Sequence, residues 1–262
     1  LGYVGRANPA AEAAEEDEEY HYFLPEMEGK SGLENVLDRQ LRGVAGGRVL
    51  RVDVSGYRRD DMGQQEAKPG SDVQLAIDVK VQKVVEDALG NVPGSAVIVD
   101  PRNGDVIAMA SSPGFDPNAF IPSISARDWD ALASNEDKPL LNRAISEHYA
   151  PGSTFKPVTL MASLGSGRLH AESIFNCPGH FDLGRTVFRC WYHAGHGDLA
   201  LTESLQYSCN VYLFHSALEC GPEAVQAMAR ECGFGRQTDI SLDFERPGLV
   251  PDGAWKRAAR RD

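Results

Sequence analysis

Apolar positions between residues 72 and 112 follow strand spacing first, then helix spacing, then strand spacing again. Residues 72–78 (DVQLAID) alternate as in a strand, whereas residues 79–90 carry an apolar stripe at positions 81, 84, 85, 88 and 89. That stripe predicts an amphipathic helix ended by Gly90. Two further apolar runs, SAVIVD and DVIAMAS, enclose the turn sequence PRNG and predict a β-hairpin. Both runs are apolar on each face, so we expect the hairpin to lie buried in a sheet.

Helical spacing dominates the second half of the chain. A short helix is expected near SARDWDALAS, and a longer one begins at Ser153, whose hydroxyl can cap its first turn. Pro157 falls in that first turn, where its missing N–H costs little, and Gly165 ends the helix. Three short helices follow in LTESLQYS, NVYLFHSALEC and PEAVQAMARECG. Strands followed by helices predict an α+β fold.

The first seventy residues differ from the rest of the chain. They are rich in glycine and charge, with a strand-like run at 48–54, and GYRRDDMGQQEAKPGS reads as turn and linker. We therefore place a domain boundary near Pro69–Gly70, between a region 1–70 with an acidic insertion and a region 71–262.

The formal net charge of -12 argues against nucleic acid as a partner. An acidic run at Glu12–Glu19 and a basic run at Lys256–Arg261 read as solvated or disordered segments. A run of about 18 apolar residues, the length of a transmembrane helix, does not occur, and neither does a secretory signal. The sequence starts without Met and ends without a closing element, so we expect a piece of a longer protein.

Ser153 and Lys156 form an S-x-x-K pattern at the expected helix start. Residues three apart on a helix share a face, so the lysine amine can reach the serine hydroxyl. A desolvated lysine can be neutral and act as the base that a serine nucleophile needs. A capping serine with a surface lysine is the alternative. A second pattern, S-x-N at Ser208 and Asn210, makes a catalytic pairing more specific than either pattern alone.

The segment 175–210 also contains a possible metal site. Cys177, Cys190, His196 and Cys209 supply three thiolates and an imidazole, a standard tetrahedral zinc set. Four protein ligands leave no open position, so the ion would be structural and would pin the loop of Ser208 and Asn210. The alternative is a Cys177–Cys190 disulfide with Cys209 as a small buried thiol.

The other cysteines, histidines and tryptophans of the chain are assigned lesser roles. Cys220 and Cys232 are expected in helices as core residues, and His180 and His193 are alternative metal ligands. Trp129, Trp191 and Trp255 are expected to pack rather than to form a binding platform.

Three stretches closely resemble the transpeptidase domain of class B penicillin-binding proteins: SAVIVDPRNGDVIAMASSPGFDPN, LLNRAISEHYAPGSTFKP and SCNVYLF. The stretch GKSGLENVLDRQLRGVAG resembles the pedestal region that precedes that domain. The resemblance is greatest to the elongation type. It implies the penicillin-binding transpeptidase fold, an antiparallel sheet flanked by helices plus a helical subdomain, present here in its N-terminal part after part of a pedestal domain.

The same resemblance implies a role for each matching residue. Ser153 would attack the penultimate D-Ala carbonyl of a peptidoglycan stem peptide and form an acyl-enzyme, with Lys156 as general base. Ser208 would relay the proton to the leaving D-Ala, and Asn210 would orient the substrate amide. β-Lactams would acylate Ser153.

The resemblance also implies partners and a location. The partners would be a membrane glycan polymerase and elongation-complex proteins. The chain would be a periplasmic part of an inner-membrane-anchored bacterial protein, without an organic cofactor.

The third family motif, K-[ST]-G, does not follow Asn210. Lys30-Ser31-Gly32 matches its letters but precedes both other motifs, so we reject it as catalytic. We therefore expect the isolated chain neither to acylate efficiently nor to close its sheet. A class D-like β-lactamase or penicillin-sensor domain remains an alternative, opposed by the pedestal-like residues 28–60. A non-catalytic, zinc-pinned scaffold is another, opposed by the intact serine, lysine and asparagine.

Overall fold

The computed structural model describes residues 1–7, 27–55 and 57–259, and the chain divides into two compact units. Unit 1 comprises Leu1–Glu147 with Ile240–Glu245, and unit 2 comprises His148–Asp239 with Arg246–Asp262. The acidic run lies outside the described residues, as does the end of the basic run. The boundary placed near residue 70 stays a prediction.

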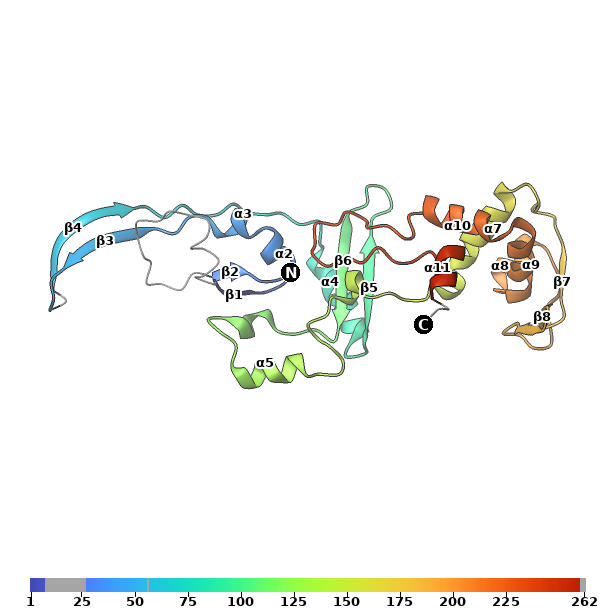
Figure 1. Cartoon of the computed structure of the whole chain (residues 1–262), viewed down its shortest axis with the longest axis horizontal. Coiled ribbons are helices and arrows are strands. Elements are labelled where there is room, and N and C mark those ends of the chain that lie inside the picture. Colours follow the sequence, from blue (N-terminus) through green and yellow to red (C-terminus); the bar gives the residue numbers. More distant parts are fainter. Residues whose placement is uncertain (8–26, 56, 260–262) are drawn as a thin grey trace. The chain divides into compact units, whose positions relative to one another are not determined.

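Unit 1 contains short antiparallel strand pairs and helices (Figure 1). In chain order its elements are β1 (Val4–Arg6), β2 (Met27–Gly29), α2 (Gly32–Val36), α3 (Asp38–Arg42), β3 (Gly47–Val52), β4 (Arg58–Gln65), α4 (Val79–Leu89), β5 (Gly94–Val99), β6 (Val106–Ser112), η1 (Pro117–Phe120), α5 (Ala126–Ala133) and α6 (Arg143–Ser146).

Two segments of unit 1 differ from the sequence prediction. The expected linker contains β4, which pairs with β3 in a long curved ribbon (Figure 1). Ion pairs across the ribbon, such as Arg48 with Asp61, replace the apolar alternation that normally signals a strand. Residues 72–78 form no strand; in the described structure the Asp78 N–H donates to the Ile107 carbonyl of β6 at 2.9 Å, but the segment adds no strand to the β5–β6 pair.

The predicted helix at 79–90 and the hairpin at 95–111 are confirmed. Asp78 caps α4 by accepting hydrogen bonds from the backbone N–H groups of Lys80 and Val81. The helix packs on β6, where Ala108 and Ala110 are 0% and 4% exposed. The other strand is not buried as expected: Val97 is 44% exposed, because among the described residues β5 and β6 form a sheet of only two strands.

Unit 2 is mainly helical, and its described strands form a β8–β9 hairpin and a β7–β10 pair that encloses that hairpin in sequence (Figure 1). Its elements are η2 (Gly152–Phe155), α7 (Lys156–Gly165), β7 (Phe175–Cys177), β8 (His180–Leu183), β9 (Thr186–Arg189), β10 (Gly197–Leu199), α8 (Leu201–Gln206), α9 (Asn210–Cys220), α10 (Pro222–Glu231) and α11 (Gly253–Ala258). The helix predicted from Ser153 to Gly165 is confirmed from Lys156 onwards, with Ser153 on the preceding turn η2, and the helices predicted beyond 201 are confirmed. No helix in the described residues is long and apolar enough to cross a membrane.

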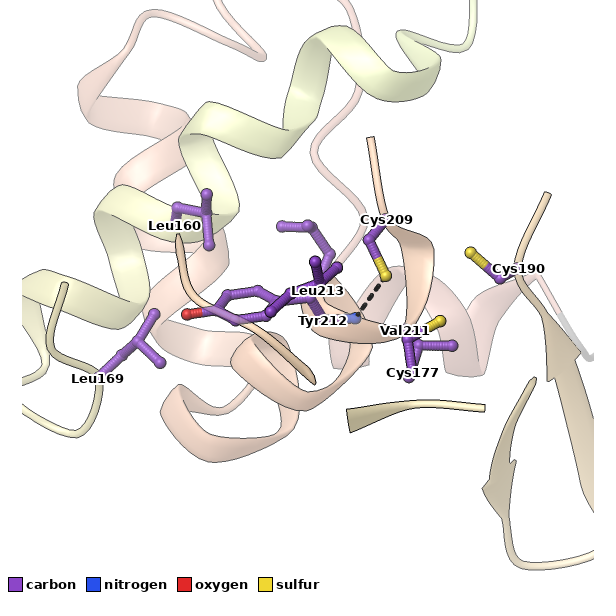
Figure 2. Close-up of a cluster of buried hydrophobic side chains, with 9 residues drawn as sticks. Leu160, Leu169, Cys177, Cys190, Cys209, Val211, Tyr212 and Leu213 are labelled. Atoms are coloured by element: carbon purple, nitrogen blue, oxygen red, sulfur yellow. Dashed lines mark hydrogen bonds between the residues drawn. The ribbon is translucent and has the colours of Figure 1, made fainter. Parts of the chain in front are cut away.

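The core of unit 2 forms where α7 packs against α9 (Figure 2). Val211 and Tyr212 of α9 are fully buried, and Leu160 of α7 and Leu169 lie beside them. Tyr212 keeps its hydroxyl satisfied by donating to the backbone oxygen of Ser173 at 2.9 Å. Three cysteine thiols, described below, gather at the other end of the same core (Figure 2).

Candidate functional site

Ser153 lies on the single turn η2 that leads into α7. Gly152 takes a φ of 57°, a left-handed conformation that favours glycine, and this starts the turn. The predicted capping role of Ser153 is wrong, because the structure records no side-chain cap at η2 or α7. Ser153 is instead exposed, with its hydroxyl free to face a ligand. Pro157 occupies the first turn of α7 as expected.

Lys156 connects this helix to the S-x-N segment. Its Nζ donates to Ser208 Oγ at 2.9 Å, to the Ser208 carbonyl at 2.6 Å and to Asn210 Oδ1 at 2.9 Å. Ser208 Oγ donates in turn to Ser153 Oγ at 3.1 Å. The structure therefore brings all four predicted residues together. Within the described chain, Lys156 reaches Ser153 through Ser208 rather than directly.

The S-x-N segment places its two polar side chains apart from its thiol. Ser208 has a φ of 50°, a left-handed conformation that is strained for a non-glycine residue. Cys209 is fully buried and caps α9, its sulfur accepting from the backbone N–H of Tyr212 at 3.5 Å (Figure 2). Ser208 and Asn210 can thus both meet Lys156 while Cys209 points into the core.

Burial and the neighbouring thiols act on the pKa of Lys156 in opposite directions, and burial has the larger effect. Burial lowers the pKa of Lys156 below its ordinary value, because a desolvated ammonium is destabilised. The thiols of Cys209 and Cys190 act in the opposite direction. No carboxylate is among the recorded hydrogen-bond partners of Lys156 in the described chain, so its charge is held by neutral oxygen atoms only.

The predicted metal ligands also converge. The Sγ atoms of Cys177, Cys190 and Cys209 and a ring nitrogen of His196 all lie within 4.8 Å of one another. Pairing of β7 with β10 sets Cys177 opposite Gly197, next to His196. Cys190 follows β9 and donates its backbone N–H to Gly179. The alternative histidines, His180 and His193, are not part of this cluster.

Glycines make this convergence possible. A Cβ added at Gly195 would lie 2.3 Å from the Cys177 carbonyl, and one at Gly179 would lie 2.2 Å from the His193 carbonyl. Both residues have positive φ, of 81° and 94°. Any other residue at either position would push the two turns apart, because real Cβ atoms do not approach a backbone oxygen so closely.

The cysteines are free thiols with unequal environments. All five are unpaired, so the structure does not contain the alternative disulfide between Cys177 and Cys190. Burial raises the pKa of Cys209 to about 12. Burial also acts to raise the pKa of Cys190, but hydrogen bonds from backbone N–H groups, such as that of Asn210, hold this pKa below its ordinary value. Cys232 is exposed and not in the core as expected, because it follows α10 rather than lying on its inner face.

Aromatic side chains around His196 form a feature that the sequence analysis missed. The indole of Trp191 and the rings of Tyr192 and Tyr207 lie 5.4, 5.2 and 6.0 Å from the His196 ring. Trp191 was expected to be a packing residue, yet it is 59% exposed. The sequence shows only that two aromatic residues follow Cys190; their position around His196 comes from the structure.

The rejected motif lies elsewhere. Lys30, Ser31 and Gly32 belong to unit 1, where Ser31 precedes α2 and Lys30 pairs with Glu28. The catalytic and metal-binding candidates all belong to unit 2. The chemistry possible at this site is that of a serine nucleophile connected by hydrogen bonds to a partly desolvated lysine.

Comparison with known proteins shows the family of the chain. Residues 94–260 match the family described as penicillin binding protein transpeptidase domain, and residues 1–75 match the penicillin-binding protein dimerisation domain. The chain is 33% identical over 263 residues to the peptidoglycan D,D-transpeptidase MrdA of Acinetobacter baumannii. That alignment covers 100% of this chain and 39% of the relative, so the chain spans about two fifths of the relative's length.

Solved structures show the same fold. The complex between penicillin-binding protein PBP2 and MreC from Helicobacter pylori superposes with a TM-score of 0.86 at 29% identity, over 100% of this chain and 49% of that one. A structure described as the structural coordination of polymerization and crosslinking by a peptidoglycan synthase complex superposes with a TM-score of 0.82 at 33% identity. The match covers 98% of this chain and 47% of that one. The predicted α+β penicillin-binding fold is confirmed, and the chain belongs to the penicillin-binding protein transpeptidase family.

Proposed function

We propose that the protein carrying this chain is a peptidoglycan D,D-transpeptidase that cross-links stem peptides through an acyl-enzyme on Ser153. The observation that carries this proposal is the unbroken hydrogen-bonded path from Lys156 Nζ to Ser208 Oγ at 2.9 Å and on to Ser153 Oγ at 3.1 Å. A serine is a weak nucleophile without a base, and this path supplies one.

Ser153 can be activated because the hydroxyl groups of Ser153 and Ser208 can rotate and change which atom donates the hydrogen bond. A hydroxyl can both donate and accept, so the chain of hydrogen bonds reverses when Lys156 is neutral. Ser153 then donates to Ser208, and Ser208 donates to the Lys156 amine. As Ser153 Oγ bonds to the penultimate D-Ala carbonyl carbon, its proton moves to Ser208 and the Ser208 proton moves to Lys156. Burial supports this role by favouring neutral Lys156.

When the tetrahedral intermediate collapses, the proton held by Lys156 is delivered to the leaving amine. The bond to the terminal D-Ala nitrogen breaks, and Ser208 passes a proton from Lys156 to that amine, leaving an ester on Ser153. The amine of a second stem peptide then attacks the ester carbonyl; as the bond to Ser153 Oγ breaks, the proton that the amine loses passes through Lys156 and Ser208 to Ser153 Oγ, which leaves the cross-link and free Ser153. A β-lactam acylates Ser153 in the same way, but its leaving nitrogen stays attached.

Asn210 is proposed to orient the substrate amide. Its Oδ1 accepts from Lys156 at 2.9 Å, and its Nδ2 makes only a long contact of 3.4 Å with the Arg189 carbonyl. A substrate carbonyl can compete for that weakly engaged N–H. The usual third motif does not follow Asn210, so no residue is assigned to the substrate carboxylate.

We further propose that Cys177, Cys190, His196 and Cys209 hold a structural zinc ion. Zinc bonds of about 2.3 Å to sulfur and 2.0–2.1 Å to nitrogen at tetrahedral angles place the two ligand atoms roughly 3.5–3.6 Å apart. His196 Nδ1 lies 3.6 and 3.7 Å from the sulfurs of Cys177 and Cys190. The donor set therefore fits the ion, which would anchor Cys209 behind Ser208 and Asn210.

The relatives suggest the cellular setting. Because one matching structure contains MreC and another is a peptidoglycan synthase complex, we propose a glycan polymerase and an elongation-complex protein as partners. Such work takes place outside the inner membrane, so we propose a periplasmic location with an anchor outside this chain.

Labelling with a fluorescent penicillin tests the activity. The full-length protein should be acylated on the peptide containing Ser153, as located by mass spectrometry, and Ser153→Ala should abolish the label. Slow release of the label is expected of a transpeptidase. Rapid turnover of the penicillin would favour the β-lactamase alternative, and no labelling of the full-length protein would favour the non-catalytic scaffold.

A further inference from the structure

Trp191 lies outside the proposed proton path but is hydrogen-bonded to the backbone beside it. The indole Nε1–H donates to the carbonyl oxygen of Tyr207 at 3.0 Å, and Tyr207 directly precedes Ser208. Tyr207 is the C-cap of α8, where backbone carbonyls have no partner within the helix. Trp191 is 59% exposed, so burial contributes little to holding its ring. The hydrogen bond to Tyr207 is therefore the directional contact that fixes the indole on this turn.

This hydrogen bond acts on a single peptide group. The carbonyl of Tyr207 and the N–H of Ser208 belong to the same planar unit. The N–H donates to the Leu205 carbonyl at 3.1 Å, and the carbonyl oxygen accepts from Trp191, which lies 16 residues before Tyr207 in the chain. Both polar atoms of the peptide group are thus held, one by the end of α8 and the other by the indole.

The orientation of this peptide group affects the position of the Ser208 side chain. The φ of Ser208, 50°, measures the rotation about the bond that joins the peptide group to the Ser208 Cα. This left-handed conformation is strained for a residue with a Cβ, so it persists only where surrounding contacts hold it. The Ser208 hydroxyl lies 2.9 Å from Lys156 Nζ and 3.1 Å from Ser153 Oγ. A rotation that relieved the strain would move the hydroxyl relative to both partners and weaken both hydrogen bonds, which depend steeply on angle.

We propose that Trp191 is a positioning residue for the acylation of Ser153. Its indole N–H holds the strained peptide group before Ser208, so that the Ser208 hydroxyl connects the base to the nucleophile. This inference rests on the function proposed above. The indole hydrogen bond ends on Tyr207 rather than on a residue of the proton path, so it acts through the position of Ser208. The role requires an N–H donor in the ring, which a phenyl or benzothiophene ring does not have.

An isosteric replacement tests the hydrogen bond while keeping the shape of the ring. In the full-length protein Trp191 is replaced by benzothienylalanine, in which sulfur takes the place of the indole N–H, and Trp191→Phe is a second variant. Trp255 is the matched control, since it is 45% exposed on α11 of the same unit, and it receives the same two replacements. Acylation by a fluorescent penicillin is followed over a concentration series, which separates the affinity of the first complex from the rate of the acylation step.

Loss of the N–H at Trp191 should slow the acylation step about fivefold, which corresponds to about 1 kcal/mol, the usual net contribution of one hydrogen bond. The affinity of the first complex should stay that of the parent, because Trp191 acts on the serine network and not on the ligand. In a Ser208→Ala background the same replacement should cause no further slowing, since no hydroxyl is left to position. Both Trp255 variants should react like the parent. Zinc content is measured for every variant, because Trp191 follows Cys190, a proposed zinc ligand.

Each contrary result contradicts a different part of this reasoning. Parental acylation by the isosteric variant would show that the indole N–H positions nothing. Equal slowing with and without the Ser208 hydroxyl, or a loss of zinc, would show that Trp191 acts through the general structure of unit 2. A weaker first complex with an unchanged acylation step would make Trp191 a ligand contact. These results overturn the positioning role and leave the proposed function intact, whereas a parent protein that is not acylated overturns both.

Discussion

Replacing Ser208 with alanine is predicted to slow acylation almost as much as removing Lys156. In the structure Ser208 Oγ lies 2.9 Å from Lys156 Nζ and 3.1 Å from Ser153 Oγ. The recorded hydrogen bonds of Lys156 in the described chain go to Ser208 and Asn210 and not to Ser153. Without the Ser208 hydroxyl, the base therefore loses its contact with the nucleophile.

The expected size follows from general base catalysis. Proton transfer by a positioned base contributes about 10²–10⁴ in rate, or roughly 2.7–5.4 kcal/mol of transition-state stabilisation. Ser208→Ala and Lys156→Met should each lose a factor in this range. Because both act in one proton path, the double variant should be little slower than either single variant.

The assay is the second-order rate constant for acylation of the full-length protein by a fluorescent penicillin. Ser166→Ala is a matched control, since its hydroxyl donates to the Ser163 carbonyl at the other end of α7. The control should react like the parent. The reasoning is refuted if Ser208→Ala retains nearly full acylation while Lys156→Met does not, because Lys156 would then act on Ser153 directly.

Three further predictions concern the base, the metal and the core. Because burial lowers the pKa of Lys156, the neutral fraction and the acylation rate should rise with pH and level off below the ordinary lysine pKa; a rate that is flat across the neutral and mildly alkaline range would contradict this. Cys177→Ser removes a proposed ligand, so it should reduce zinc affinity by more than the ~100-fold cost of losing a hydrogen bond to a ligand. Metal analysis after competition with a chelator measures this loss, and the exposed Cys232→Ser should keep the affinity of the parent. Tyr212→Phe should lower the free energy of unfolding by about 1 kcal/mol in urea titrations, since its hydroxyl is bonded to Ser173; an unchanged midpoint would show that this bond contributes nothing net.

Local signals in the sequence were sufficient to predict most of the helices and one β-hairpin. The helix at 79–89 was predicted from its apolar stripe and Gly90, and the structure adds Asp78 as its N-cap. Strands were less predictable because a strand needs a partner. The alternating segment 72–78 forms no strand in the described structure, whereas the charged residues 58–65 form β4 by pairing with β3.

For the site, the sequence by itself determined which residues are predicted to carry chemistry, and the structure brings these residues together. S-x-x-K on a helix start, S-x-N, and three cysteines with a histidine are patterns of residue type and spacing, and they identify Ser153 and its neighbours without coordinates. They do not determine which atoms touch, because Lys156 and Ser208 are 52 residues apart and meet only when α7 packs on α9.

Only the tertiary structure decided the route from the lysine to the nucleophile and the surroundings of the cysteines. The spacing of Ser153 and Lys156 suggested a direct contact, yet packing directs Lys156 to the strained turn at Ser208. The exposure of Trp191 was likewise invisible in the sequence, since burial depends on what the rest of the fold covers. The chemical type of each residue can be read from the sequence, but the distances between side-chain atoms and their exposure to solvent depend on how the chain packs.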